Sequence, residues 1–351
     1  MLRSLVVAGM LLATLGLAAA PARTTQADAK PRVIAFEPDQ RIWQIAFTDR
    51  YLAWESEQGE EGTPALVQRD LRTKRQRTLA PKVHPEYGMA STRDWVVYAS
   101  GLHALFAVRH DGSGRRTLTA NLAAPFAGRG ERIAWAELVN GSYRIVVRNM
   151  ATGKRWVAAR IPRCVSRRCY RIDGVTLADD GVVFTRGAIG EQPSFIVRRG
   201  FADPAPTSVA VPHDPQLELA PSSAGALYYV FGRGWQRWDF GTRKPRATRF
   251  GVADQNTILQ YEDGHWLTRR TRGCRETLQV IRPSGRGAVL AASKGVLKLA
   301  HLKPTGCADI VAFHAIGNRA ITAWRFQQPA TDKYPVGLNL AGIVVSQPFR
   351  R

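Results

Sequence analysis

Residues 132–147 read RIAWAELVNGSYRIVV, in which two runs rich in β-branched and aromatic residues flank the dipeptide Asn140-Gly141. An Asn-Gly pair suits the two positive φ angles of a tight hairpin turn, and each run has the length of a strand. The segment therefore predicts an antiparallel β-hairpin.

Strands ending in a large apolar anchor recur along the chain. The anchors are Trp54, Tyr98, Trp135, Phe184, Tyr229, Leu267 and Phe313, at intervals of 44, 37, 49, 45, 38 and 46 residues. Four-stranded propeller blades repeat at this length, whereas helical repeats would show an apolar residue every 3.6 positions, which these segments lack. The prediction is an all-β fold, a single β-propeller of four-stranded antiparallel blades, seven in number with six as the alternative.

A polar turn follows the third strand of most units. The five copies read DLRTK (70–74), HDGSG (110–114), NMATGK (149–154), DFGTR (239–243) and PSGRG (283–287). Together with GERIAW (130–135) and DGSGRRTLT (111–119), they resemble the TolB-like, WD40-like β-propeller repeat over roughly residues 41–345. The Ser-Pro-Asp-Gly core of the family pattern is absent. The resemblance implies the propeller fold and almost nothing about function.

A propeller closes when both ends of the chain share a blade. The run VIAF (33–36) can complete the last blade beside GIVV (342–345), which would leave no open sheet edge. Residues 32–351 are therefore expected to form one domain.

The N-terminus has the pattern of an export signal. A basic start precedes an apolar or small run over residues 5–20, and Ala20-Pro21-Ala22 suits signal peptidase. Residues 1–22 are expected to be a signal peptide and residues 23–31 a disordered leader. The mature chain would have no transmembrane span and would be secreted or periplasmic, with an uncleaved N-terminal anchor as the alternative.

Export makes the four cysteines candidates for disulfides, because an oxidising compartment keeps thiols paired. Cys164 and Cys169 form the natural local pair, which leaves Cys274 for Cys307. The strand assignment, however, puts Cys274 and Cys307 in loops on opposite faces of adjacent blades. A zinc site is the competing interpretation, but no CxxC pair or nearby histidine has ligand spacing.

The chain is strongly basic. Its 50 Lys and Arg, 41 of them Arg, outnumber 28 Asp and Glu and give a formal net charge of +22. Such a charge attracts nucleic acid, acidic polysaccharide or anionic membranes, although codon composition alone can also produce it.

Two arginine clusters surround cysteines, and we predict that they lie in loops on one face, outside the predicted strands. The first lies between blades three and four and the second within blade six; the members are Arg160, Arg163, Arg167, Arg168 and Arg171, and Arg269, Arg270, Arg272 and Arg275. Guanidinium groups suit capture of carboxylate or phosphate. They are the candidate anion-binding residues, and the alternative is a pair of solvated, mutually repelling loops.

No motif identifies a catalytic centre. The seven histidines have no metal or catalytic spacing, and a Gly-x-Ser-x-Gly elbow is absent. We therefore predict a monomeric, non-catalytic propeller without cofactor or metal, which binds or scaffolds an anionic polymer or a protein. The alternative is a propeller lyase or hydrolase that acts on an acidic polysaccharide at the central channel.

Overall fold

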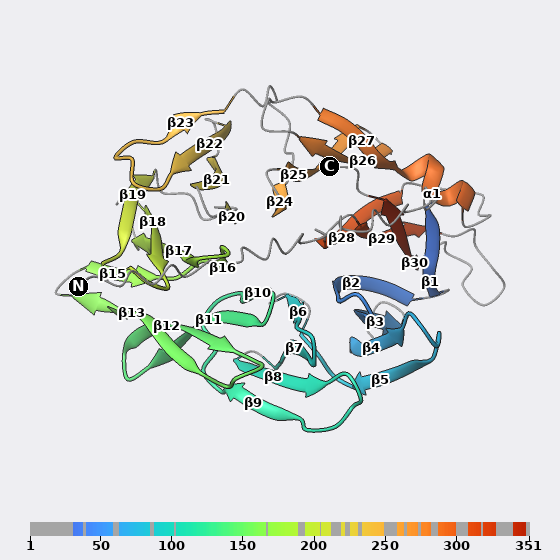
Figure 1. The fold of residues 1–351 in the computed structure, drawn as a ribbon, viewed down its shortest axis with the longest axis horizontal. Coiled ribbons are helices and arrows are strands. Elements are labelled where there is room, and N and C mark those ends of the chain that lie inside the picture. Colours follow the sequence, from blue (N-terminus) through green and yellow to red (C-terminus); the bar gives the residue numbers. More distant parts are fainter. Residues whose placement is uncertain are drawn as a thin grey trace, which may run out of the picture.

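The strands form a ring of sheets around a central axis, and their colours run from blue to red around it (Figure 1). The computed structural model describes residues 31–37, 40–58, 63–84, 88–101, 103–165, 168–188, 194–203, 205–211, 219–221, 225–230, 234–248, 258–262, 265–272, 275–281, 287–299, 308–316, 319–327 and 340–348. The predicted signal peptide and all of the predicted leader except its last residue lie outside these ranges.

Seven four-stranded antiparallel blades make up the ring, which confirms the all-β propeller and its blade number. Blade one contains β2 (Gln40–Phe47), β3 (Tyr51–Gln58), β4 (Ala65–Asp70) and β5 (Gln76–Ala80). Blade two contains β6 (Met89–Ser91), β7 (Trp95–Ser100), β8 (Ala104–Arg109) and β9 (Arg116–Thr119). Blade three contains β10 (Ala127–Arg129), β11 (Arg132–Val139), β12 (Ser142–Asn149) and β13 (Arg155–Pro162).

Blade four is preceded by two extra short strands, β14 (Cys164–Val165) and β15 (Arg168–Arg171). The blade itself contains β16 (Val175–Leu177), β17 (Gly181–Ala188), β18 (Ser194–Gly200) and β19 (Thr207–Val211). Blade five contains β20 (Leu219–Pro221), β21 (Gly225–Val230), β22 (Gly234–Asp239) and β23 (Arg246–Ala247). Blade six contains β24 (Ile258–Glu262), β25 (His265–Arg272), β26 (Arg275–Ile281) and β27 (Gly287–Ala292).

Blade seven joins the two ends of the chain. Its strands are β28 (Ala308–Ile316), β29 (Arg319–Gln327), β30 (Leu340–Pro348) and β1 (Arg32–Glu37). The N-terminal β1 is the outer strand and pairs antiparallel with β30, with Val33 opposite Val345 and Phe36 opposite Ile343. The predicted closure is confirmed.

The hairpin predicted over residues 132–147 forms β11 and β12. Val139 lies opposite Ser142, and the two turn residues between them have φ angles of 50° at Asn140 and 70° at Gly141. These positive angles are the reason for the Asn-Gly pair, because other residues adopt them at a cost.

One anchor was wrong. Phe313 lies on β28, the innermost strand of blade seven, whereas the other anchors lie on the second strand of their blades. The second strand of blade seven is β29, and its buried aromatic is Trp324. The physical reason is an insertion between β27 and β28 that includes α1 (Ser293–Leu299), the one helix of the described residues. It delays the last repeat, so Trp324 follows Leu267 by 57 residues.

The core lies between neighbouring blades. On the second strands, Trp54, Tyr98, Trp135, Phe184 and Trp324 are almost completely buried. Trp135, for example, packs with Val97 and Leu105 of blade two. Each blade therefore hides its apolar faces against both neighbours, which explains why one large residue recurs in each repeat.

The alternation of strand direction gives the ring two faces. The turn face carries the turns after the first and third strands of each blade, such as residues 48–50, 71–75, 92–94 and 110–115. The connection face carries the turns after the second strands and the links between blades, such as residues 101, 103, 140–141 and 163. The innermost strands contact one another around the ring, from β2 through β28 and back to β2.

Candidate functional site

The first arginine cluster lies on the connection face, where blade three passes to blade four. Arg160 is near the end of β13, Arg163 follows that strand, and Arg171 ends β15. Tyr170 N donates to Arg163 O at 2.6 Å, so the two sides of the short β14–β15 hairpin are held together at its base.

Cys164 and Cys169 are joined by a disulfide, as predicted. They face each other as partners of β14 and β15, with Cα atoms 4.0 Å apart. The disulfide closes the hairpin that carries the first arginine cluster. Cys274 and Cys307 lie outside the described residues.

The prediction that both clusters lie outside strands was wrong for most of their members. Arg160, Arg168 and Arg171 belong to β13 and β15, whereas Arg269, Arg270 and Arg272 belong to β25 and Arg275 begins β26. The strands run on past their apolar residues, because the polar segments continue the backbone pairing up to the turns. Arg167 is outside the described residues, and only the backbone is described for Arg168, Arg270, Arg272 and Arg275.

Four arginine side chains of the two clusters are described, and only two of them have a neutralising partner among the described residues. Arg171 Nε lies 2.6 Å from Asp173 Oδ1. Arg269 lies 4.0 Å from Glu276 Oε1 and donates from Nη1 to Ile310 O at 2.9 Å. Both of these guanidiniums therefore already have partners.

Arg160 and Arg163, by contrast, are exposed. Neither makes an ion pair within the part of the chain that the structure describes. Their guanidinium groups are therefore available to an anionic partner from solution.

A further arginine joins them that the sequence interpretation missed. Arg186 on β17 is half-buried, and its guanidinium carbon lies 5.1 Å from the ring centre of Tyr170 and 4.7 Å from that of Phe195. Its Nε is buried without a hydrogen-bond partner among the described residues. No local pattern marks Arg186, because Tyr170 and Phe195 come from two other strands. We call Arg160, Arg163, Arg186 and Tyr170 the disulfide-loop site.

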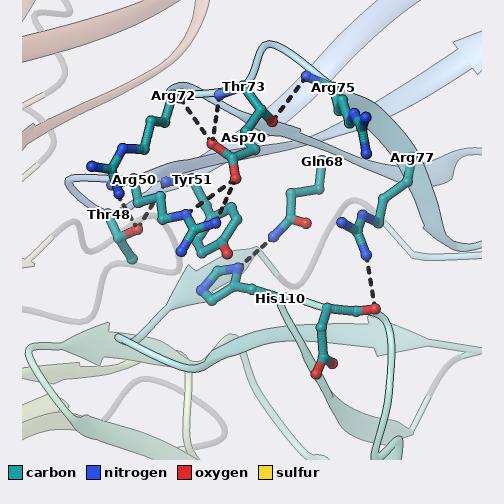
Figure 2. Close-up of polar contacts among 11 residues, drawn as sticks. Thr48, Arg50, Tyr51, Gln68, Asp70, Arg72, Thr73, Arg75, Arg77 and His110 are labelled. Carbon is teal, nitrogen blue, oxygen red and sulfur yellow. Dashed lines mark hydrogen bonds and ion pairs between the residues drawn. The ribbon is translucent and has the colours of Figure 1, made fainter.

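A second polar cluster ties blades one and two together on the turn face (Figure 2). His110 is buried and stacks on Tyr51 with ring centres 4.3 Å apart. Gln68 Nε2 donates to His110 Nδ1, and His110 Nε2 donates to Thr92 O at 3.0 Å. Burial lowers the pKa of His110. The ring is therefore neutral with both nitrogens occupied, which suits a structural role and not proton transfer.

Asp70 organises the turn beside this histidine. Its Oδ1 accepts from Arg72 N and Thr73 N at 2.8 and 3.1 Å, and its Oδ2 accepts from Arg50 at 2.9 Å (Figure 2). These hydrogen bonds lower the pKa of Asp70 against the opposing effect of desolvation. The carboxylate is fully used in holding the turn, as Asp side chains commonly are there.

The described residues hold neither a metal-ligating cluster nor a membrane-spanning helix. They contain no group of three or more His, Cys, Asp or Glu side chains that could hold a metal ion. They also contain no helix of the length and apolar character needed to cross a membrane.

Comparisons with known proteins identify the fold alone. No protein-family model and no curated protein sequence matches the chain. A prolyl endopeptidase structure aligns with a TM-score of 0.57 and 10% identity over 83% of this chain and 45% of that one, so this chain spans less than half its length. The propeller domain of the Trilobed protease from Pyrococcus furiosus aligns with a TM-score of 0.54 and 9% identity, over 81% and 91% of the two chains. The polysaccharide lyase Uly1 aligns with a TM-score of 0.52 and 8% identity, over 88% and 90%. The fold is a β-propeller, and the chemistry must be argued from the residues of this chain.

Proposed function

We propose that this protein is an exported, non-catalytic, monomeric β-propeller that binds an anionic polymer or an acidic protein surface through the disulfide-loop site. In this proposal residues 1–22 are a signal peptide, residues 23–31 a disordered leader, and the repeats belong to the TolB-like, WD40-like group. The Cys164–Cys169 disulfide supports export, because such bonds persist in oxidising compartments.

The observation that supports this proposal is a group of arginines, beside one disulfide-closed hairpin, without acidic partners among the described residues. Arg160 and Arg163 are exposed without an acidic partner, and Arg186 is held against two aromatic rings. A guanidinium that stacks on an aromatic ring keeps its N–H edge free for an oxyanion. The disulfide narrows the conformations of the loop, which lowers the entropic cost of binding.

The test measures binding to heparin, a sulfated polymer, by fluorescence polarisation at several salt concentrations. Replacing Arg160 and Arg163 with Gln should weaken binding at least about tenfold, because two charge-assisted contacts are lost. The slope of log K against log salt should become shallower by roughly 1.5 to 2. Adding Arg186→Gln should extend both effects.

The matched control replaces Arg72 and Arg75 with Gln. Both are exposed on the turn face, and the change in net charge is the same. Equal losses from the two pairs would mean that the net charge acts diffusely, and the disulfide-loop site would be abandoned. Shortening of the polymer during the assay would replace the binding role with a lyase or hydrolase activity.

A further inference from the structure

Three arginines come close together at the boundary of blades two and three, on the turn face, and two of them stack on one tryptophan. Trp95 begins β7, Arg109 lies opposite it at the end of β8, and Arg116 begins β9. Arg148 comes from β12 of blade three, on the same side of that strand as Val146, which packs against blade two. The cluster therefore draws on both blades.

Two of the guanidiniums stack on the indole. The guanidinium carbon of Arg116 lies 3.9 Å from the ring centre of Trp95, and that of Arg109 lies 5.2 Å away. Trp95 is 7% exposed, so its indole holds these side chains at the edge of the core. Cation–π contact stabilises the planar faces but leaves the N–H groups unsatisfied.

Several guanidinium N–H groups of this cluster are buried without a hydrogen-bond partner among the described residues. Among the described residues, Arg116 Nε and Nη2 and Arg148 Nε have no hydrogen-bond acceptor. None of Arg109, Arg116 and Arg148 forms an ion pair in the described part of the chain. Burial, and then the charges of Arg148 and Arg109, lower the pKa of Arg116. Three like charges at one place are costly unless something neutralises them.

The carboxylates nearby make their bonds to other groups. Asp111 accepts from Ser113 N and Oγ at 2.8 and 2.6 Å, and these hydrogen bonds, followed by the charges of Arg109 and Arg77, lower its pKa without an ion pair to the cluster. Glu131 Oε1 accepts from Arg93 N at 3.1 Å, and its Oε2 has no partner among the described residues.

Glu137, the buried acid of the same blade boundary, is also engaged. It is bound by Arg155 at 2.7 Å and lies 3.9 Å from Arg144. Since no carboxylate of the described residues forms an ion pair with its three arginines, the cluster around Trp95 keeps a net positive charge.

We propose that Arg109, Arg116 and Arg148 form a second anion site, distinct from the disulfide-loop site, which binds a sulfate or phosphate group between blades two and three. A tetrahedral oxyanion offers acceptors in several directions, which suits guanidiniums that arrive from three strands. The group can be a free ion or part of a larger molecule. The site lies on the opposite face from the disulfide-loop site and does not depend on the function proposed there.

The first test follows thermal unfolding with sodium sulfate and sodium phosphate against sodium chloride at equal ionic strength. Sulfate and phosphate stabilise most proteins weakly through exclusion from the surface. The site adds a saturable rise in Tm to that background, as expected for a ligand that binds only the folded state. Arg148→Gln should abolish the saturable part, with the affinity weakened about tenfold or more.

Arg115→Gln is the matched control. Arg115 precedes Arg116 but stacks on Phe106 at 4.6 Å instead of on Trp95. This variant should keep the saturable rise. In chloride alone, Arg148→Gln should unfold at a higher temperature than the unaltered protein, because it removes one of three repelling charges.

A second measurement covers the case in which Arg148→Gln does not fold. Isothermal titration with Arg109→Gln, whose side chain is exposed, should show weaker binding of the same anion. Inorganic sulfate, inorganic phosphate and a sulfated oligosaccharide are titrated in parallel, and the tightest of them identifies the source of the oxyanion. The proposal is overturned if no probe binds more weakly to Arg109→Gln or Arg148→Gln than to Arg115→Gln. Since the disulfide-loop site is intact in all three variants, this failure would leave the proposed function untouched.

Discussion

Replacing Glu55 with Gln should stabilise the protein at neutral pH and have little effect below pH 4.5. Glu55 lies on β3, its side chain is fully buried, and neither carboxylate oxygen has a hydrogen-bond partner among the described residues. Burial raises the pKa of this carboxyl from 4.5 to about 8, because the charged form loses its hydration and gains no compensating contact.

The sign and size of the effect follow from proton binding. The folded protein keeps the proton on Glu55 up to about pH 8, whereas the unfolded chain releases it near pH 4.5. Between these values the folded state binds more protons, so the free energy of unfolding falls as pH rises. Each pKa unit corresponds to about 1.4 kcal/mol, which gives a loss of about 3.5 kcal/mol between pH 4.5 and pH 7.5. Glutamine has nearly the same shape and no charge, so the variant avoids this loss.

Urea denaturation at half-unit steps from pH 4 to pH 8.5, followed by tryptophan fluorescence, measures the difference between the two proteins. The difference should widen steadily with pH and level off above pH 8. Glu55→Asp keeps an ionisable group at the position and should keep the fall in stability. Parallel curves for the unaltered protein and Glu55→Gln would refute the reasoning, since they would mean that the carboxylate is solvated or paired.

Three other predictions concern the blades and their closure. Mass mapping of the non-reduced protein should find Cys274 bonded to Cys307, because the residues that follow them are partners in parallel strands; free thiols at both positions would contradict this. His110→Leu should lower the free energy of unfolding by about 2 to 4 kcal/mol, since it leaves Gln68 and Thr92 O without their partner; a loss below about 0.5 kcal/mol would show that the tie is unimportant. A chain that begins at residue 38 lacks β1 and exposes the edge of β30, so it should unfold at a lower temperature and associate in size-exclusion chromatography; unchanged behaviour would mean that closure does not need β1.

Local patterns were enough to predict the fold because every blade repeats the same short-range features. A large residue on the second strand and a polar turn after the third are both short-range features. They predicted seven blades, the hairpin at Asn140-Gly141 and the place of β1. The error at Phe313 arose because β28 and β29 are both apolar, and periodicity cannot show which of two adjacent apolar strands is the innermost.

The wrong strand assigned to Phe313 also explains why the sequence interpretation placed Cys274 and Cys307 on opposite faces. With residues 310–313 on the innermost strand, β28 begins at Ala308 on the connection face, where β26 also begins. Arg275 and Ala308 are partners of parallel strands, although the sequence interpretation had put the cysteines before them on opposite faces. The pairing inferred from cysteine number was thus compatible with the fold, and the strand boundary was at fault.

The sequence showed where arginines are concentrated but not which of them come together in space. Charge runs identified Arg160 and Arg163 beside the disulfide-closed hairpin, where neighbours along the chain are also neighbours in space. Arg116 and Arg148 lie in different blades, 32 residues apart, and they come close because blades two and three pack face to face across one boundary. Such meetings depend on register across blades, which one sequence without a structure does not reveal.

Structural arginines in this molecule differ from candidate binding ones in having carboxylate partners. Arg198 on β18 is 13% exposed at its side chain and stacks on Phe240, much as Arg116 stacks on Trp95. Arg198, however, is held by Asp180 at 2.8 Å and by Asp203 at 2.7 Å. Where this fold buries an arginine against an aromatic ring for stability, it can supply the carboxylates as well. At the boundary of blades two and three the aromatic ring is present, but no carboxylate of the described residues forms an ion pair with Arg109, Arg116 or Arg148. An oxyanion from solution would do there what the two aspartates do around Arg198.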